Sequence, residues 1–307
     1  MSRLPERAAW IAVDWGTSNL RLWRLDAAGE VLGEVRSDRG MGKLRPEEFE
    51  PILLDLLAGD LPDHGRLTVV ACGMVGARQG WQEARYVPVP ARPPGIAQAL
   101  KVETRDPRLS VHILPGMSQA APADVMRGEE TQIAGFLASE PGFDGVLCLP
   151  GTHCKWAHIS AGEVVSFRTF MTGEIFALLS GQSVLRHSIA PSGFDAETFA
   201  AAVTHVMSRP QTLAGDLFSI RAEALLSGLD ATRARSRLSG LLIGAELAAA
   251  RPYWLGQQIV ILGEGGLSAA YRTALEAQGA PARTVNAERM TLMGLAAAWR
   301  TLAEDDR

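Results

Sequence analysis

The chain has 307 residues, of which 47% are hydrophobic and 21% are charged, and its formal net charge is −4. This composition is typical of a globular protein, and the length suffices for two lobes with separate cores. The negative charge leaves no basic surface for nucleic acid, and no apolar run approaches the length of a membrane span. Nucleic acid and membranes are therefore excluded as favoured partners.

The cysteines indicate the compartment. The chain has three of them, Cys72, Cys148 and Cys154, and each stands among mostly apolar residues. An odd number in such surroundings argues against a disulfide framework and suits a reducing environment. We expect a cytoplasmic protein. The oligomeric state stays open, with a homodimer as one possibility.

Two apolar runs joined by a polar turn occupy residues 11–24, and the first run ends at Asp14. The turn consists of small or polar residues: Gly16, Thr17, Ser18 and Asn19. Small residues let backbone N–H groups approach an anion, and a carboxylate at the strand end can hold a hydrated cation beside it. The pattern predicts a β-hairpin with an anion-binding tip, although an ordinary tight turn remains an alternative.

A second copy of this pattern begins with the apolar run 145–149. The run leads into Gly151, Thr152 and His153, and a further apolar strand starts at Cys154. A third strand is expected after each hairpin, at 30–36 and at 163–169. The recurrence predicts a duplicated three-stranded opening, one copy in each lobe.

Between and after these hairpins, apolar spacing predicts helices at 49–57, 172–179, 194–207, 213–226, 238–250 and 291–302. Thr172 is a plausible N-cap of its helix. Glycine-bearing turns are expected at 73–80 and 115–118, each after a strand. Arg233, Arg235 and Arg237 follow one another at every second position, which we interpret as a solvated helix face.

A third glycine turn follows the apolar run 258–262 and precedes a helix expected at 269–278. A strand, a glycine turn and a helix in succession allow a nucleotide to lie against the backbone. The glycine spacing is not that of a Rossmann fingerprint. The candidate contacts are Gly263, Glu264, Gly265, Gly266 and Ser268.

Together, the two hairpins and the third glycine turn resemble the signatures of the actin, Hsp70 and sugar-kinase superfamily, in the expected order. Within it, the chain is most similar to the 2-dehydro-3-deoxygalactonokinases. The runs that carry this resemblance are 14–21, 73–76, 126–132, 150–156 and 239–246.

The resemblance implies a two-lobed α/β fold of the actin-like ATPase (ribonuclease H-like) type. Each lobe would hold a mixed sheet with flanking helices, and a cleft would lie between the lobes. We expect the lobes at 1–126 and 127–307, with the last helix returning to the first lobe.

The implied activity is transfer of the γ-phosphoryl group of ATP, assisted by Mg²⁺, to the 6-hydroxyl of 2-dehydro-3-deoxygalactonate in galactonate catabolism. The two hairpin tips would then bind the ATP phosphates, the third glycine turn the adenosine, and Asp14 the metal. Phosphoryl transfer needs mainly positioning and neutralisation of charge, which amide-rich tips and a metal supply.

A carboxylate must also accept the proton of the sugar hydroxyl. Sugar kinases that resemble this chain carry a Gly-Asp pair at the start of the helix before the second hairpin, and Gly128-Glu129 occupies that place. We therefore predict Glu129 as the base, with Glu130 and Asp124 as alternates. Acidic residues also favour a helix N-terminus without any catalytic role, so this interpretation stays open.

For the sugar-acid pocket, Arg21 and Arg127 are candidates to bind the carboxylate, because guanidinium pairs with it bidentately. The first glycine turn supplies the remaining candidates, although core packing is the more common fate of its large side chains. These are Gly73, Met74, Val75, Gly76 and Trp81.

Other functions stay open at this stage. A phosphoanhydride hydrolase and an ATP-gated binding module of the same fold are the main alternatives. A thiol nucleophile at Cys154 with His153 as its base is disfavoured, because adjacent residues on a strand point to opposite faces. Zinc is not supported, since no second Cys or His stands at ligand spacing near Cys154.

Overall fold

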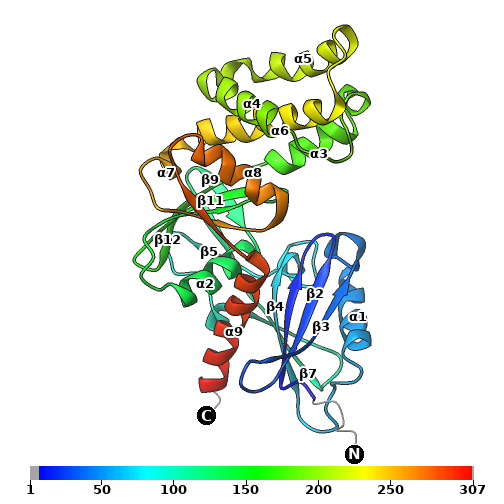
Figure 1. The fold of residues 1–307 in the computed structure, drawn as a ribbon. Coiled ribbons are helices and arrows are strands. Elements are labelled where there is room, and N and C mark those ends of the chain that lie inside the picture. Colours follow the sequence, from blue (N-terminus) through cyan, green and yellow to red (C-terminus); the bar gives the residue numbers. More distant parts are fainter. Residues whose placement is uncertain (1–6, 306–307) are drawn as a thin grey trace, which may run out of the picture. The chain divides into compact units, whose positions relative to one another are not determined.

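The computed structural model describes residues 7–305, which form two compact units (Figure 1). The described part of the first unit comprises 7–143, 161–165 and 287–305, and the second unit comprises 144–160 and 166–286. The sequence suggested a boundary after residue 126. The contacts within the chain divide it after Phe143 instead, and they group the last helix with the first unit.

The first unit is built on a mixed sheet with strand order β3-β2-β1-β4-β7-β6. Strands β1, β2 and β3 are antiparallel to one another, β4 and β7 run parallel to β1, and β6 is antiparallel to β7. The bounds are β1 (Trp10–Trp15), β2 (Leu20–Leu25), β3 (Val31–Ser37), β4 (Leu67–Gly73), β6 (Leu100–Val102) and β7 (Leu109–Ile113).

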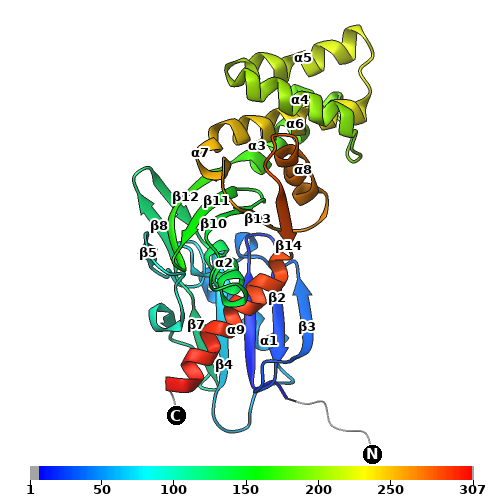
Figure 2. The same ribbon diagram turned by 60° about the vertical axis from the view of Figure 1, so that its left-hand side comes forward.

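Helices cover both faces of this sheet, because β1 is apolar on both sides. Helix α1 (Phe49–Leu56) packs on the face to which Ile11 and Val13 contribute. Helix α9 (Ala287–Asp305) packs on the opposite face, where Trp10 of β1 stacks on Trp299 with ring centroids 4.9 Å apart. Figure 2 shows α9, in red, crossing that face.

A smaller sheet of order β5-β8-β9 and helix α2 (Glu129–Ser139) complete the first unit. Its strands are β5 (Tyr86–Pro88), β8 (Gly116–Ala120) and β9 (Ala123–Met126). The predicted turn at 115–118 is therefore wrong, since residues 116–118 pair with β5 and residues 117–120 pair with β9.

Helix α2 lies so close to α9 that only glycine fits at the crossing. A Cβ atom on Gly135 would lie 1.9 Å from the Met290 carbonyl oxygen, and one on Gly294 would lie 2.1 Å from the Thr131 carbonyl oxygen. This contact ties α2 to the first unit and explains why the division comes after residue 126.

The sheet of the second unit has the order β12-β11-β10-β13-β14. Strand β11 is antiparallel to β10, whereas β13 runs parallel to β10 and β14 parallel to β13. The bounds are β10 (Gly145–Leu149), β11 (Cys154–Ser160), β12 (Glu163–Phe170), β13 (Ile259–Leu262) and β14 (Ala282–Val285). This order repeats β3-β2-β1-β4-β7, so the predicted two-lobed α/β fold with a duplicated opening and a mixed sheet in each lobe is confirmed.

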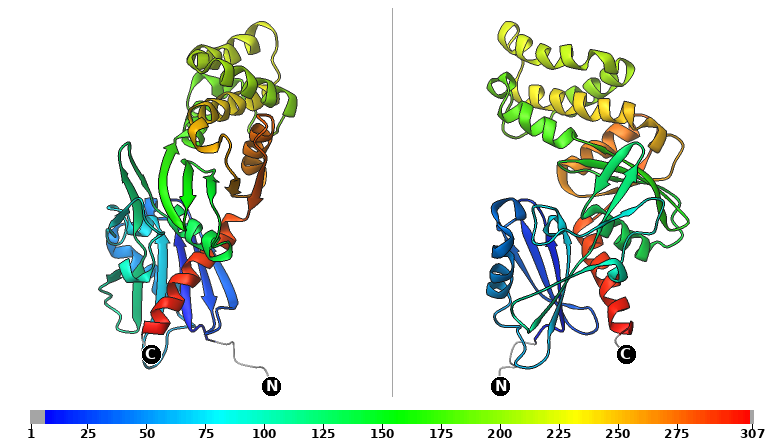
Figure 3. Two further views of the ribbon diagram at one scale, coloured as in Figure 1. Left: turned by 90° about the vertical axis from the view of Figure 1, so that its left-hand side faces the viewer. Right: turned by 180° about the vertical axis from the view of Figure 1, so that it is seen from behind.

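Helices of the second unit pack on this sheet and on one another (Figures 1 and 3). Helices α4 and α6 approach closely, because a Cβ atom on Gly240 would lie 2.5 Å from the Phe199 carbonyl oxygen. The bounds are α3 (Thr172–Gly181), α4 (Ala196–Ser208), α5 (Leu213–Leu226), α6 (Ala231–Ala249), α7 (Arg251–Trp254) and α8 (Gly265–Glu276).

The start of α6 and the N-cap of α3 differ from the prediction for local reasons. Helix α6 begins at Ala231 rather than 238, because the Asp230 side chain caps it by accepting N–H groups of Thr232 and Arg233. Thr172 is not an N-cap. It is the first residue of α3, and its hydroxyl donates to Glu246 instead.

Short 3₁₀ segments connect some of these elements, at Met41–Lys43, Pro46–Glu48, Met74–Gly76, Ile96–Gln98, Val184–His187 and Pro210–Thr212. Within residues 7–305, no helix has the length and apolar character that a membrane crossing would need.

Candidate functional site

The first predicted tip forms the turn between β1 and β2, as expected. The Gly16 amide donates to the Asn19 carbonyl at 2.9 Å, which closes the turn. Thr17, Ser18 and Asn19 are exposed. The hydroxyls and amides of this tip are therefore accessible to a ligand.

A second turn, which sequence reasoning missed, supports the tip from behind. The amides of Met41 and Gly42 donate to the carbonyls of Gly16 and Thr17 at 2.9 and 2.8 Å. A Cβ atom on Gly40 would lie 2.2 Å from a backbone carbon of Ser18, so only glycine fits there. The signal available was weak, because Gly40-Met41-Gly42 matches no motif.

Asp14 lies at the end of β1, in register with Arg21 on β2 and Cys72 on β4. Burial raises the pKa of the Asp14 carboxyl, Arg21 opposes this effect, and the charges of Glu129 and Glu288 add to it. Carboxylates from two other segments therefore act on Asp14. A divalent cation would relieve their repulsion.

Arg21 already has a carboxylate partner within the chain. Its Nη1 atom lies 2.8 Å from Glu288 Oε2, and Arg36 Nη2 lies 2.6 Å from Glu288 Oε1. Glu288 is in the first turn of α9, and no motif pointed to it. The predicted substrate arginine at position 21 is thus neutralised by Glu288 in this structure.

Glu129 is the first residue of α2, and its side chain is partly exposed. Its Oε2 atom accepts the Arg127 amide N–H at 3.0 Å, which fixes the carboxylate beside the helix start. Gly128 precedes it with φ +104°, and a Cβ atom on Gly128 would lie 3.4 Å from the Cα of Gly73. The helix start therefore packs against the turn that follows β4.

The two alternate carboxylates have different surroundings. Glu130 is fully buried and accepts the Gly128 amide at 2.7 Å and the Thr131 hydroxyl at 3.0 Å. Burial, and then the charge of Glu129, raises the pKa of Glu130 to about 8. Asp124 is partly exposed on β9, where it accepts the amide of Val125 at 2.8 Å. Of the two carboxylates at the start of α2, Glu129 is therefore the one that a substrate can reach.

Arg127 is buried with little to balance its charge. Its Nη2 atom donates to the Ala84 carbonyl at 2.8 Å, and its guanidinium carbon lies 4.3 Å from the centre of the Tyr86 ring. Among the described residues, its Nε and Nη1 atoms have no hydrogen-bond partner. An unsatisfied buried guanidinium is costly, so this position favours an anion.

The glycine turn after β4 has a tight backbone. Gly73 has φ +87°, and a Cβ atom there would lie 2.9 Å from the Trp15 carbonyl oxygen and 3.3 Å from Asp14 Oδ1. A Cβ atom on Gly76 would lie 2.8 Å from Arg127 Nη1. The turn therefore lies between Asp14 and Arg127.

The larger side chains of this turn contribute to the core. Val75 is fully buried, and Met74 and Trp81 are partly buried against the same cluster. Trp81 stacks on Phe49 with ring centroids 6.1 Å apart. Packing explains these three side chains without a ligand.

In the second unit, the second tip joins β10 to β11, as expected. Thr152 and His153 are exposed, and His153 Nε2 lies 2.5 Å from Glu174 Oε2. The Glu174 amide donates to the Thr152 carbonyl at 2.9 Å. A Cβ atom on Gly173 would lie 2.3 Å from the Gly151 carbonyl oxygen. The start of α3 therefore supports this tip closely.

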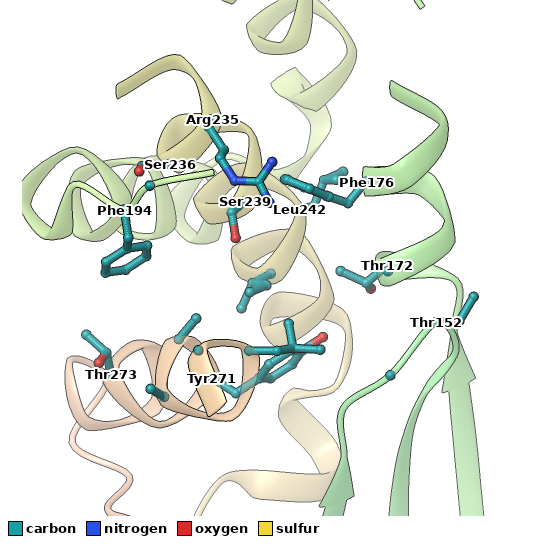
Figure 4. Close-up of a pocket in the computed structure, with 18 residues that line it drawn as sticks. Thr152, Thr172, Phe176, Phe194, Arg235, Ser236, Ser239, Leu242, Tyr271 and Thr273 are labelled. Carbon is teal, nitrogen blue, oxygen red and sulfur yellow. The ribbon is translucent and has the colours of Figure 1, made fainter. Parts of the chain in front are cut away.

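A cavity of about 580 Å³ opens beside the tip within the second unit (Figure 4). Such a volume is in the usual range for a small-molecule site. Gly151, Thr152 and Gly266, all predicted nucleotide contacts, line it. It also has lining residues that sequence reasoning did not assign, among them Thr172, Gly173, Phe176, Phe194, Arg235, Ser239 and Tyr271.

Arg235 supplies the cation of this cavity. Its guanidinium carbon lies 4.9 Å from the centre of the Phe176 ring, an arrangement visible in Figure 4. The interpretation of Arg233, Arg235 and Arg237 as a solvated face is therefore wrong for Arg235. Two-residue spacing on a helix turns side chains by about 200°, so neighbours in such a series do not share a face.

The third glycine turn lies at the start of α8, which begins at Gly265 rather than 269. Ser268 is buried, and a Cβ atom on Gly263 would lie 2.3 Å from its hydroxyl oxygen. Glu264 is exposed and accepts the Asn286 side-chain amide at 2.5 Å. Gly266 lines the cavity, so the turn contributes backbone to it.

No group of three or more His, Cys, Asp or Glu side chains among the described residues is arranged to hold a metal ion by itself. Magnesium does not need such a cage, because it commonly takes one or two carboxylates together with phosphate oxygens. Asp14, with its repelling carboxylate neighbours, fits such a shared site.

The strand order repeated in both units and the family match that follows identify a kinase of the actin-like fold. Residues 14–298 match the family model described as 2-keto-3-deoxy-galactonokinase. The chain belongs to this family.

Similar proteins bear the name of the same kinase. The chain is 42% identical to a probable 2-dehydro-3-deoxygalactonokinase of Rhizobium meliloti (strain 1021), over 95% of this chain and 97% of the relative. It is 36% identical to the 2-dehydro-3-deoxygalactonokinase of Escherichia coli (strain K12), over 89% and 91%. A crystal structure from Sinorhizobium meliloti that bears the same kinase name is 40% identical, with a TM-score of 0.88 and coverage of 95% of this chain and 99% of that one.

Proposed function

We propose that this protein transfers the γ-phosphoryl group of ATP to the 6-hydroxyl of 2-dehydro-3-deoxy-D-galactonate, which yields ADP and the 6-phosphate. Membership of the family supports the reaction class and the substrate. The observation that carries the proposal is Glu129, a partly exposed carboxylate fixed at the start of α2 in the same unit as Asp14 and Arg127. This unit then holds the sugar acid.

In this mechanism Glu129 accepts the proton of the 6-hydroxyl while the oxygen attacks the γ-phosphorus. A general base of this kind must reach the hydroxyl and be ionised. Glu129 meets the exposure requirement, and the neighbouring Glu130, with its pKa of about 8, remains largely protonated at neutral pH and adds little repulsion.

Asp14 would hold Mg²⁺ together with phosphate oxygens of ATP. When bound, the ion neutralises charge that develops on the phosphoryl group. The first tip, Gly16 to Asn19, adds hydroxyls and backbone amides for phosphate oxygens, and the backing turn at Gly40 to Gly42 keeps its backbone in place.

Arg127 is the better candidate of the two arginines for the substrate carboxylate. Arg21 is already paired with Glu288, whereas Nε and Nη1 of Arg127 have no hydrogen-bond partner among the described residues. A bound carboxylate near the guanidinium would compensate a charge that the protein itself leaves unbalanced. This supports selection of a sugar acid over a neutral sugar.

ATP would bind to the second unit, with its base in the cavity beside Phe176 and Arg235 and its phosphates toward Gly151, Thr152 and His153. The apolar lining with one cation suits an aromatic base.

The three cysteines are free and buried, which agrees with action in a reducing cytoplasm.

Coupled measurement of ADP release with a panel of 2-keto-3-deoxy sugar acids tests the proposal. Release should rise well above the background with the galactonate epimer and less with the gluconate epimer. Release with water alone would favour the phosphoanhydride hydrolase. Nucleotide binding without release on any sugar acid would favour the binding module and reject the kinase assignment.

A further inference from the structure

A buried carboxylate at the centre of the second unit joins its separate elements. Glu246 lies on α6 and has 3% of its surface exposed. Its Oε1 atom accepts the Trp156 indole N–H at 2.8 Å, and its Oε2 atom accepts the hydroxyls of Thr172 and Tyr271, the latter at 2.7 Å. The donors come from β11, α3 and α8, so four elements meet at one side chain.

Two of these donors line the cavity assigned to the nucleotide. Thr172 and Tyr271 are both among its lining residues, and Figure 4 shows them on the α3 and α8 sides of the space. Trp156 belongs to the strand that leaves the second tip. Glu246 itself is behind the wall and is not one of the lining residues.

The start of α3 carries this arrangement to the phosphate tip. Directly after Thr172, Gly173 contacts the Gly151 carbonyl, and the Glu174 amide donates to the Thr152 carbonyl at 2.9 Å. A shift of Thr172 away from Glu246 would therefore move the support of the tip.

Both carboxylate oxygens of Glu246 act as acceptors in this arrangement. Indole N–H is a donor only, and both hydroxyls use their hydrogens on Glu246. Burial raises the pKa of Glu246, while hydrogen bonds from Cys154, Thr172, Tyr271 and Trp156 oppose that rise. A glutamine would turn its NH₂ group toward the Thr172 and Tyr271 hydroxyls, which would then have to accept instead of donate and would lose the acceptor of their own hydrogens.

We propose that Glu246 is a positioning residue for ATP. By holding Thr172 and Tyr271 to the strand of Trp156, it fixes the walls of the base cavity and the support of the phosphate tip in one arrangement. Preorganisation of this kind lowers the cost of ordering a site when its ligand binds. The inference rests on the proposed nucleotide site but not on the identity of the phosphoryl acceptor.

The test compares Glu246→Gln with the wild-type chain by calorimetric titration with ATP and with ADP, without sugar acid. Loss of the acceptor that Thr172 and Tyr271 share should weaken binding about tenfold or more. In turnover, KM for ATP should rise by a similar factor while KM for the sugar acid stays unchanged. Tyr271→Phe and Thr172→Val, which each remove one donor, should give smaller changes in the same direction.

A matched control separates positioning from general stability. Glu50 is a second buried carboxylate, located in the first unit, and it accepts the amides of Arg105 and Asp106 at 3.1 and 2.7 Å. Glu50→Gln should lower the melting temperature without changing ATP affinity. If Glu246→Gln lowers the melting temperature as Glu50→Gln does and binds ATP like the wild type, the positioning role is rejected.

The outcomes also separate this inference from the proposed reaction. A wild-type chain that binds ATP but phosphorylates no sugar acid would reject the proposed function and leave the role of Glu246 to the titrations. If Glu246→Gln does not fold, the two single-donor variants decide. Unchanged ATP affinity in both Tyr271→Phe and Thr172→Val overturns the inference.

Discussion

The two units share one strand order but differ at their tips. In the first unit the residue two positions before the tip glycine is Asp14, and in the second it is Leu149. The charges of Glu129 and Glu288 act on Asp14. The second tip adjoins an apolar cavity and a buried, fully bonded Glu246. The two copies of the sheet thus differ in what lies beside them: carboxylates in the first unit and a mostly apolar cavity in the second.

This difference indicates how the two copies divide their tasks. Accessible carboxylates suit a cation and proton transfer, whereas an apolar cavity with one arginine suits an aromatic base. Each prediction below assigns an effect to one unit and none to the other. A substitution in one unit that changes the KM of the substrate assigned to the other unit would contradict this division of tasks.

The largest effect is expected for Glu129→Gln. Removing the proton acceptor should lower kcat by about 10² or more, because general base catalysis contributes on that scale. ATP binding, in which Glu129 has no assigned part, should remain within twofold of the wild-type value, on the order expected for a group outside the binding contacts. Steady-state kinetics and a titration with ATP measure the two quantities.

The alternates serve as controls for this variant. Asp124→Asn should leave kcat near the wild-type value, because Asp124 is on β9 and bonds to its neighbouring amide. If Asp124→Asn abolishes turnover and Glu129→Gln does not, the base is Asp124 and the assignment of Glu129 fails.

Arg127→Met should act on the sugar acid alone. Loss of the guanidinium should raise KM for the sugar acid by about tenfold or more, since charged hydrogen bonds contribute about 1.5–3 kcal/mol. KM for ATP should not change. The comparison is with Arg21→Met, because Arg21 already pairs with Glu288 at 2.8 Å.

A neutral analogue with the carboxylate reduced to an alcohol sharpens this test. The wild type should prefer the acid strongly, and Arg127→Met should lose most of that preference. A preference that survives in Arg127→Met and disappears in Arg21→Met would transfer carboxylate recognition to Arg21.

Much of the fold could be predicted from the sequence because its signals are local. Each hairpin shows an apolar strand, a glycine turn and a second strand, and both formed where expected. The turn at 115–118 was mispredicted because its glycine suggested a bend, whereas pairing with β5 and β9 extends it. Strand pairing over a distance is not visible in a local window.

The candidate site divides in the same way. Asp14, Glu129 and the two tips lie within recognisable motifs, so sequence reasoning could name them. Glu288 and Arg235 could not be named, because each acquires its role from partners far along the chain: Glu288 from Arg21, and Arg235 from Phe176. Whether such a residue belongs to a site depends on its burial and on its distant partners, and a pattern in a single sequence reports neither.

The pH dependence of stability tests the acidic unit by itself. An unfolded Glu carboxyl has a pKa of 4.5, and in the folded chain that of Glu130 is about 8. Between these values the folded state retains a proton that the unfolded state has released, so rising pH favours unfolding. This contribution to stability is present below about pH 4.5 and is lost as the pH rises through 8.

Denaturant unfolding at several pH values measures this effect. From pH 5 to 8, Glu130 should lower the free energy of unfolding by up to about 1.4 kcal/mol per pH unit. Glu130→Gln mimics the protonated form, so its curve should be flatter and it should exceed the wild type in stability at pH 8. Parallel curves for the two proteins would show that the Glu130 carboxyl is already ionised in the fold.

The smallest effect is expected for Arg235→Gln in the second unit. Exposed or half-exposed cation–π contacts contribute about 0.5–1 kcal/mol, so KM for ATP should rise about two- to fivefold. The KM for the sugar acid should stay the same. Arg233→Gln is the matched control, because Arg233 is exposed on the same helix and bonds to the Thr198 hydroxyl at 3.1 Å.

Base selectivity completes this test of the second unit. If Arg235 contacts the base, Arg235→Gln should change the ratio of kcat/KM for ATP to that for GTP, while Arg233→Gln should leave it unchanged. An equal response of the two variants would mean that Arg235 only packs on Phe176. The cavity would then select its ligand by shape alone. The second unit would bind ATP through apolar contacts, whereas the first would act through its charged residues.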